Sequence, residues 1–364
     1  MHQTSKLNRL IGSANAVIDT KGIIRTNGKP ASLRTVKLTR EALNSTCRRL
    51  HMMGFYLEDI QGLSAKHIDA LVRNWYADKL NPKTMQNLLS RLRVFSGWIN
   101  KRGIVREGGV PAFLPDVPPS ELKVKTYTQN SKSWTGRAVD TLKVIDKAFD
   151  EDKRLYAMLM MSVTFGLRRK EVLHIKPHDA DRGDGIHIDS HIGKGGRYRF
   201  IPIFATDEDP NVKAMGLIQL KVLELAKKLC RPGEHLGWSG NTYVQNDRKY
   251  GYLMGKLGIT KHELGIVGHG LRAEFAENAL LLQGIVPPVL GGTGKEVGTA
   301  ERKKIVTNVA SVMGHNDTHT SGAYYGSFHN PSLVKVVGSF SAVTAKDIAS
   351  ERVGKLCSYK VRLT

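Results

Sequence analysis

The chain has 364 residues, of which 41% are hydrophobic. That length and composition allow two or three folded domains and exclude an intrinsically disordered protein. Lysine and arginine together outnumber aspartate and glutamate by 22 residues. So large an excess indicates a polyanionic partner, with nucleic acid as the first candidate and an anionic membrane surface as the second.

The sequence contains no apolar stretch of membrane-spanning length and no signal peptide, so we expect no membrane partner. The three cysteines, Cys47, Cys230 and Cys357, are far apart and lack the spacing of a zinc site. Free thiols favour a reducing compartment. We therefore expect a cytoplasmic protein, associated with the nucleoid if its host is bacterial.

The first 34 residues are polar and basic with little periodicity, and we expect them to form a flexible basic arm. Three helical stretches follow, of which the first covers about 37–53. The second begins after Ser64, a good N-cap residue, and the third opens at Asn81-Pro82. These stretches predict a small helical domain over residues 35–106.

The third of these stretches carries an apolar stripe at helical spacing, and its other faces are basic. A basic surface on a small helical domain favours binding to DNA. The candidate DNA contacts in this domain are Lys83, Arg91 and Arg93.

Residues 107–135 are rich in glycine, proline and small polar residues, which predicts a linker. A second domain follows over residues 136–330, and residues 331–364 form a C-terminal tail. The fold class is therefore mainly α, with one small β-hairpin between Ile186 and Ile203. We expect helices at about 154–165, 211–230 and 270–283, and another that runs into Gly314-His315.

Several basic side chains of the second domain suit chemistry at a phosphodiester. Negative charge grows on the non-bridging oxygens when the phosphorus is attacked, and a permanently charged arginine fork fits those oxygens. Arg168, in Gly166-Leu167-Arg168, and Arg272, in His269-Gly270-Leu271-Arg272, are the candidate pair. His269 and Arg272 are three residues apart at the start of a helix and share one face.

The expected hairpin turn, Gly193-Lys194-Gly195-Gly196, carries a lysine that could protonate a leaving oxygen. Two arginines follow the turn, and we expect both to contact backbone phosphates. They are Arg197 and Arg199.

The order and local spacing of these motifs resemble the tyrosine recombinase (phage-type integrase) family over about residues 35–345. The resemblance implies a two-domain DNA clamp, in which a helical core-binding (SAM-like) domain faces an α+β catalytic domain. It also implies that neither a cofactor nor a metal is needed, because a 3′-phosphotyrosine intermediate retains the bond energy of the cut strand.

The resemblance assigns a role to each motif. Six positions match the family's catalytic residues in order, namely Arg168, Lys194, His269, Arg272, His315 and Tyr324, and Glu171 matches a residue that supports the first arginine. In that pattern the lysine is a general acid and the first histidine transfers a proton or binds phosphate. The second histidine donates to a non-bridging oxygen, and the tyrosine is the nucleophile. Tyr325 is the adjacent alternative to Tyr324.

The implied function is that of a site-specific recombinase, the integrase of a mobile element. Its partners would be double-stranded DNA sites, and four copies of the chain would exchange strands through a Holliday junction. An accessory DNA-bending or directionality protein is a further partner that the resemblance allows. The tail, residues 331–364, would pass between neighbouring protomers.

One departure from the family pattern is the length between Arg272 and His315. The extra residues fall at about Gly284–Lys304, which we expect to be a surface insertion. This segment contains Gly294-Lys295, but Glu296 and Val289 occupy positions where a nucleotide-binding loop needs Ser or Thr and Gly. An NTPase is therefore excluded.

Three other functions remain open at this point. A type IB topoisomerase uses similar residues, but the motifs Gly166-Leu167-Arg168 and Met313-Gly314-His315 favour an integrase. A catalytically silent DNA-binding protein is the non-enzyme alternative, although no catalytic position has degenerated. An RNA-binding protein is the most distant reading, because no aromatic-rich recognition motif is present.

Overall fold

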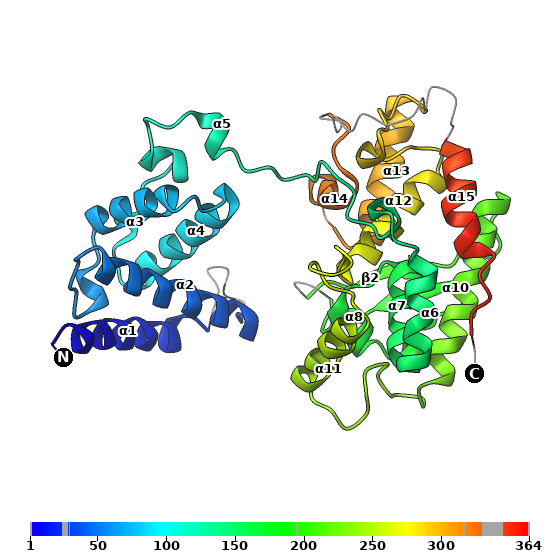
Figure 1. Ribbon diagram of the computed structural model, residues 1–364, viewed down its shortest axis with the longest axis horizontal. Helices are drawn as coiled ribbons and strands as arrows, with labels where there is room; N and C mark the ends of the chain where they lie inside the picture. Colours follow the sequence, from blue (N-terminus) through cyan, green and yellow to red (C-terminus); the bar gives the residue numbers. More distant parts are fainter. Residues whose placement is uncertain are drawn as a thin grey trace. The chain divides into compact units, whose positions relative to one another are not determined.

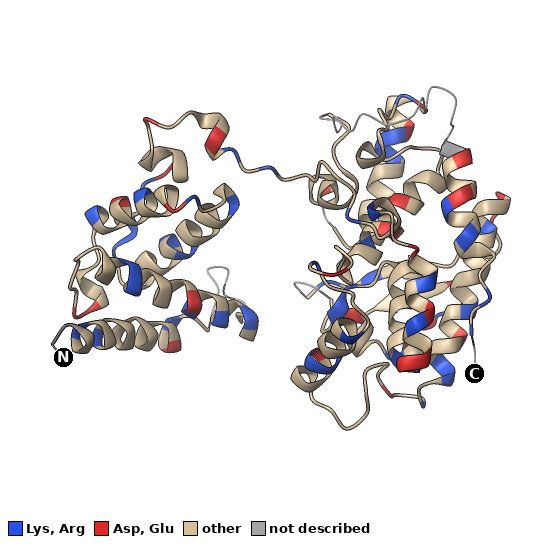
Figure 2. Ribbon diagram, in the orientation of Figure 1, with Lys and Arg blue, Asp and Glu red and all other residues tan. Residues whose placement is uncertain are grey.

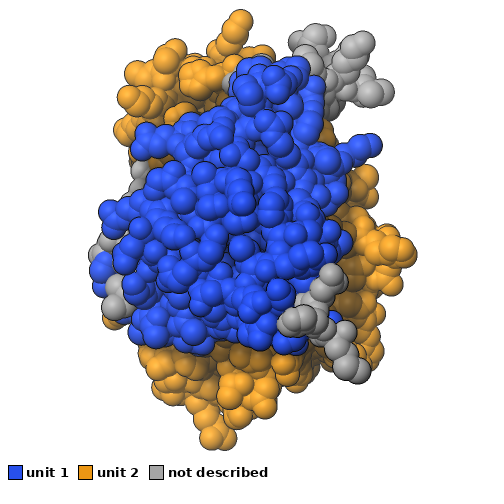
Figure 3. Space-filling view, turned by 90° about the vertical axis from the view of Figure 1, so that its left-hand side faces the viewer, with its two compact units in different colours: residues 1–125 blue, residues 126–364 orange. Residues whose placement is uncertain are grey.

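The structure is a computed structural model that describes residues 2–23, 28, 30–193, 196–315, 317–329 and 345–362. The chain divides into two compact units, residues 1–125 and 126–364, which Figure 3 colours separately. Each unit has its own hydrophobic core. No helix in the described ranges is long and apolar enough to cross a membrane.

The regular elements of unit 1 within its described residues are helices (Figure 1). Its main helices are α1 (His2–Lys21), α2 (Leu33–Met52), α3 (Ala65–Ala77) and α4 (Pro82–Trp98). The three helices predicted from the sequence are confirmed as α2, α3 and α4. Their caps are as expected, because Ser64 forms a capping box with His67, and Asn81 accepts from the backbone N–H of Lys83.

The prediction of a flexible arm over residues 1–34 is wrong. Residues 2–21 form helix α1, whose Leu10, Ala14 and Ile18 are buried in the core of unit 1. These residues recur every fourth position, which places them on one face of a helix. The side chain of Ser13 also accepts a hydrogen bond from the backbone N–H of Ile60, at 2.9 Å.

The predicted linker, residues 107–135, is also largely folded. Its first part forms the short helices η3 (Val110–Phe113) and α5 (Pro119–Leu122), whose apolar side chains enter the core of unit 1. Its last part belongs to unit 2, where Trp134 is fully buried. Proline and glycine here produce tight turns that pack apolar residues, so composition alone misplaced the boundary.

Unit 2 is built around helix α7 (Lys153–Phe165), which is buried along its length from Leu155 to Phe165. Helices α6 (Thr141–Glu151), α10 (Pro210–Lys228) and α12 (His269–Leu282) pack against α7. A helix that is apolar all round requires such neighbours on several sides. The remaining helices are α8 (Arg169–His174), α9 (Pro177–Ala180), α11 (Tyr243–Lys256), α13 (Thr299–Val312), α14 (Thr318–Tyr325) and α15 (Ala345–Cys357).

The predicted hairpin is confirmed as an antiparallel pair, β1 (Gly185–Ile188) and β2 (Arg199–Pro202). Ile188 pairs with Arg199, the residue that opens β2. Helices α7, α10 and α12 match the stretches predicted from the sequence, and α13 leads into Gly314 as expected. The described part of the chain is thus mainly α with a small sheet, as the sequence predicts.

The segment 284–304 is not simply a surface insertion. Ile285 and Val289 are buried, and the short helix η5 (Pro288–Leu290) lies against Gly326, at the end of α14. Its later residues form the first turn of α13. The extra length is therefore partly used to pack the helix that carries Tyr324.

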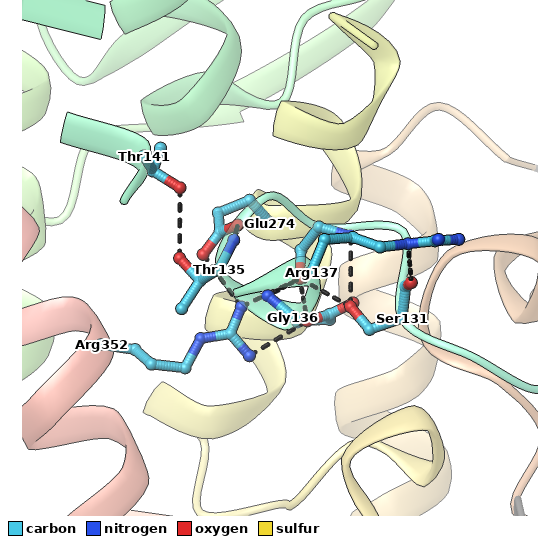
Figure 4. Close-up of polar contacts among 9 residues, drawn as sticks. Ser131, Thr135, Gly136, Arg137, Thr141, Glu274 and Arg352 are labelled. Atoms are coloured by element: carbon cyan, nitrogen blue, oxygen red, sulfur yellow. Dashed lines mark hydrogen bonds and ion pairs between the residues drawn. The ribbon is translucent and has the colours of Figure 1, made fainter. Parts of the chain in front are cut away.

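Helix α15 attaches to α12 through a buried group that we call the carboxylate cluster, shown in part in Figure 4. Arg352 contacts Glu274 at 2.9 Å and Glu277 at 3.0 Å. Ser131 and Ser133 each donate to Glu277 at 2.7 Å. The cluster joins three separate parts of unit 2. Residues 331–344 of the predicted tail lie outside the described residues.

Candidate active site

The end of helix α7 sets the position of Arg168. Gly166 has a left-handed backbone (φ 62°), and a Cβ there would lie 2.4 Å from the ring of Phe275. Glycine is therefore required by both conformation and space. The turn that it permits places Arg168 at the N-cap of α8.

Glu171 holds Arg168 in place. One carboxylate oxygen accepts from the guanidinium of Arg168 at 2.7 Å, and the other accepts from its backbone N–H at 2.7 Å. The same second oxygen accepts from Arg199 at 2.6 Å. Burial alone would raise the pKa of Glu171, but Arg199 and Arg168 outweigh it and lower that pKa, so the carboxylate is ionised at neutral pH.

Arg272 rises from the first turn of α12 and is completely buried. Its guanidinium donates to two backbone carbonyls, that of Gly166 at the end of α7 and that of Met313, which precedes Gly314. The carbonyl of Met313 also accepts from Arg168, at 2.9 Å. The two predicted arginines therefore converge on one carbonyl. Burial lowers the pKa of Arg272, and Tyr324 is the largest influence that opposes this shift.

Tyr324 lies next to Arg272 in the structure. Its hydroxyl accepts from the Nε of Arg272 at 3.2 Å, and the guanidinium carbon lies 5.3 Å from the centre of its ring. The ring of His315 stacks on Tyr324 with a centroid distance of 5.4 Å, and the ring of His269 lies at 5.3 Å. Five of the six predicted catalytic residues are thus in one group; the sixth, Lys194, lies outside the described residues.

Tyr324 and Tyr325 are adjacent in sequence but have different neighbours in the structure. Both side chains belong to the core cluster beneath α14, but Tyr325 lies near Phe328, and burial raises its pKa to about 12. On the other side, Nδ1 of His315 shares a 2.7 Å hydrogen bond with the hydroxyl of Ser321. This bond fixes the plane of the imidazole against α14.

The donors of this group suit an anion. Three arginines and two histidines supply N–H groups, whereas the one carboxylate, Glu171, is already bonded to two of those arginines. Arginine forks match the oxygens of a phosphate, and a carboxylate so engaged is a poor ligand for a cation.

The comparisons with known proteins concern the N-terminal part of the chain and its fold. A family model described as phage integrase, N-terminal, matches residues 17–103. No curated protein matches the sequence. A lambda integrase tetramer bound to a Holliday junction matches with a TM-score of 0.53 and 13% identity, covering 89% of this chain and 79% of that one.

Two other solved structures match at a similar level. A lambda integrase dimer bound to a COC′ core site has a TM-score of 0.52 and 14% identity, covering 88% of this chain and 98% of that one. A lambda integrase fragment bound to DNA has a TM-score of 0.51 and 15% identity, covering 92% of this chain and 97% of that one. Residues 17–103 thus match the N-terminal domain of phage integrases, and the chain shares the fold of lambda integrase.

The remaining predicted residues differ in how exposed they are. Lys83 and Arg197 are exposed, as a DNA contact requires. Arg91 and Arg93 are half-buried and donate within unit 1, to the hydroxyl of Thr39 at 2.9 Å and the carbonyl of Arg106 at 2.7 Å. Arg199 has a different place from the one expected, because it is only 6% exposed and pairs with Glu171.

Sequence reasoning missed Lys132, which lies beside α14, the helix that contains Tyr324. Its ammonium group donates to the carbonyl of Ala323 at 3.0 Å, next to Tyr324. Burial lowers the pKa of Lys132, and Tyr324 opposes that shift. The residue belongs to the stretch predicted as a linker, so no local motif could have pointed to it. A second contact in the same stretch, from Thr128 N–H to Gly322 O at 2.9 Å, holds it along α14.

Proposed function

We propose that this protein is a site-specific tyrosine recombinase, the integrase of a mobile element, which cuts and rejoins DNA through a 3′-phosphotyrosine intermediate and a Holliday junction. The observation that carries the proposal is the position of the Tyr324 hydroxyl, 3.2 Å from the buried Nε of Arg272. The same hydroxyl belongs to a ring flanked by two imidazoles. A tyrosine in the ordinary core would have no need of an arginine and two histidines around it.

The reaction needs one bond to form and one to break at a phosphorus atom. Tyr324 Oη attacks the phosphorus while its proton passes to a base, for which His269 is the candidate. The bond from phosphorus to the 5′ oxygen breaks, and that oxygen takes a proton from Lys194, the predicted general acid. Rejoining reverses each transfer, so the chemistry consumes neither ATP nor a metal ion.

Arg168, Arg272 and His315 would bind the non-bridging oxygens during this attack. A preorganised set of donors is worth most when it is held before the substrate arrives. The shared carbonyl of Met313 supports that role, because it keeps the two guanidinium groups together.

The partners of the proposed reaction are two double-stranded DNA sites and four copies of this chain. The excess of 22 positive charges supports a polyanionic substrate, and binding should weaken steeply with salt as counterions are released. The lambda integrase tetramer on a Holliday junction, which shares this fold, supports the same stoichiometry here. An accessory DNA-bending or directionality protein is a further proposed partner.

Covalent trapping tests this function. The wild type and the variants Tyr324→Phe and Tyr325→Phe are incubated with nicked duplexes from the DNA that flanks the gene. A nick near the cut lets the short released strand diffuse away, so the adduct cannot reverse. The adducts are then resolved under denaturing conditions.

We expect the wild type and Tyr325→Phe to form a denaturant-resistant adduct, and Tyr324→Phe to bind DNA without forming one. An adduct with Tyr324→Phe but not with Tyr325→Phe would move the nucleophile to Tyr325. Specific binding without any adduct would favour a catalytically silent DNA-binding protein. Relaxation of supercoiled DNA by a monomer, without paired sites, would favour a type IB topoisomerase.

A further inference from the structure

Arg199 occupies a position where a strand would normally carry an aliphatic residue. It opens β2, and the buried positions of that strand are Arg199 and Ile201. Its partner across the hairpin is Ile188, which is also buried. A charged side chain is costly in such a place unless its partners are charged or polar.

Arg199 has two such partners, and they come from different elements. One Nη donates to Glu171 at 2.6 Å, and the other donates to the carbonyl of Val312 at 2.9 Å. Val312 is the last residue of α13. Its carbonyl therefore accepts no hydrogen bond from within the helix. Burial lowers the pKa of Arg199 to about 9, but Glu171 opposes that shift and the group stays charged at neutral pH.

These bonds connect Arg199 to both sides of the candidate site. Glu171 holds Arg168 by two bonds, while Val312 directly precedes the Met313-Gly314-His315 turn. Gly314 leaves the space for this arrangement, because it has φ 65° and a Cβ there would lie 2.9 Å from the Cδ of Arg199. The carbonyls of Val312 and Met313 are thus held by arginines from three different elements.

We propose that Arg199 is a positioning residue, which aligns Arg168 with His315 by bonding Glu171 and the carbonyl of Val312 at the same time. It acts through these groups and does not itself contact a DNA phosphate. The proposal rests on the proposed function, because it concerns the geometry of the same phosphate-binding group.

The shape of the side chain explains why arginine is used. A guanidinium group is a rigid fork whose two Nη atoms reach two partners in one plane. A lysine could bond only one of the two at ordinary length. The Nε of Arg199 is buried without a hydrogen-bond partner among the described residues. Burying an unbonded N–H group costs free energy, so the two Nη contacts, and not the bulk of the side chain, explain why arginine stands here.

The test compares Arg199→Lys and Arg199→Met with Arg197→Met, which removes an exposed charge two residues earlier. Single-turnover cleavage of a nicked duplex at saturating protein gives the rate, and titration at several salt concentrations gives the affinity and its salt slope. Thermal unfolding fixes a temperature at which every variant is folded. Both Arg199 variants should keep the wild-type salt slope and lose about 10²-fold in rate, a loss typical of a displaced catalytic group.

Arg197→Met should show the opposite pattern, with weaker binding and a salt slope lower by about one contact. If Arg199→Met behaves like Arg197→Met, Arg199 contacts phosphate directly and the inference is overturned. Near-normal cleavage by Arg199→Lys would overturn it as well, because a single charge would then be sufficient.

A double-mutant cycle separates positioning from general destabilisation. In an Arg168→Ala background, Arg199→Lys should cost less than about 3-fold in rate, since the group that it aligns is already gone. Independent, multiplying losses would contradict the proposal. If the wild type forms no covalent adduct at all, the proposed function fails; if the wild type cleaves and the cycle is additive, only this inference fails.

Discussion

Unit 2 buries two groups of arginine and glutamate, and their ratios are opposite. The arginine cluster, at the candidate site, combines Arg168, Arg199 and Arg272 with the single carboxylate of Glu171. The carboxylate cluster combines Glu274 and Glu277 with the single guanidinium of Arg352. Both clusters include residues of α12, yet one keeps an excess of positive charge and the other an excess of acceptors.

The difference shows which cluster is complete. Around Glu274 and Glu277, two serine hydroxyls and the backbone N–H of Thr135 supply the remaining donors, so the acceptors are satisfied within the protein. Around Glu171, the other partners of the three arginines among the described residues are backbone carbonyls and the Tyr324 hydroxyl. A buried surplus of positive charge is stabilised by a bound anion, which in the proposed reaction is the scissile phosphate.

The largest effect should come from removing the only cation of the carboxylate cluster. Arg352→Met leaves two buried carboxylates without a counter-charge, and we expect the unfolding free energy of unit 2 to fall by about 3–5 kcal/mol. Urea denaturation of the full chain measures it. Lys355→Met, which breaks only the exposed pair with Glu351, is the matched control and should change stability by less than about 0.5 kcal/mol. An equal loss of unfolding free energy in the two variants would show that Arg352 is no more important to stability than an exposed cation.

Removing one cation of the arginine cluster should affect catalysis more than stability. Arg168→Ala leaves Glu171 paired with Arg199, so we expect a stability loss smaller than that of Arg352→Met. Its cleavage rate should fall about 10²-fold, or about 2.7 kcal/mol of transition-state stabilisation. The control is Arg169→Ala, whose side chain pairs with Asp247 and lies over Tyr250 instead. Near-normal single-turnover cleavage by Arg168→Ala would exclude it from the phosphate site.

The two clusters should also respond oppositely to pH. The pKa of Glu171 is lowered from 4.5, so its contribution to stability is complete above that value and is lost as the pH falls through the folded pKa. The pKa of Glu277 is raised by burial, so its contribution is complete below 4.5 and is lost as the pH rises through the folded pKa.

The comparison needs the stability difference between wild type and Glu171→Gln, and between wild type and Glu277→Gln, across pH 3 to about 7. The first difference should grow with rising pH and the second should shrink. Parallel curves would show that the two carboxylates have similar environments after all.

The smallest effects should come from exposed basic residues outside both clusters. Lys83→Ala and Arg197→Ala should each lower the salt slope of DNA binding by about 0.9 and leave the rate at saturation unchanged. A filter or fluorescence titration between low and moderate salt measures the slope. A rate loss at saturation by either variant would extend the catalytic group beyond the arginine cluster.

The structure brings most of the predicted site residues together because their motifs lie at helix and strand ends. Gly166 and Gly314 mark such ends, and the residues beside them, Arg168 and His315, are brought together by the packing of α7, α12 and α13. Arg199 was predicted to contact DNA phosphates, and its burial could not be foreseen because strand alternation does not say which face of a short hairpin is covered. The answer depends on Glu171, 28 residues away.

The parts that sequence reasoning missed depend on long-range contacts. Helix α1 is polar on most of its surface, and its stripe of Leu10, Ala14 and Ile18 is recognisable only against the face of α2 that it covers. Lys132 belongs to a segment whose composition indicates a linker, although hydrogen bonds to α14 order it. In both cases the deciding partner is remote in sequence, so local propensity could not reveal it.

The carboxylate cluster has a consequence for the order in which unit 2 folds during synthesis. Arg352 and Ser133 are 219 residues apart, and Arg352 and Glu274 are 78 residues apart. Until α15 leaves the ribosome, α12 must carry two carboxylates that no cation neutralises, and such non-local contacts form late. Ribosome-bound chains that stop before α15 should therefore be digested readily by protease within unit 2. Chains that extend past Arg352 should resist digestion, so that α12 and the helix α14 that packs against it become fixed only once α15 has emerged.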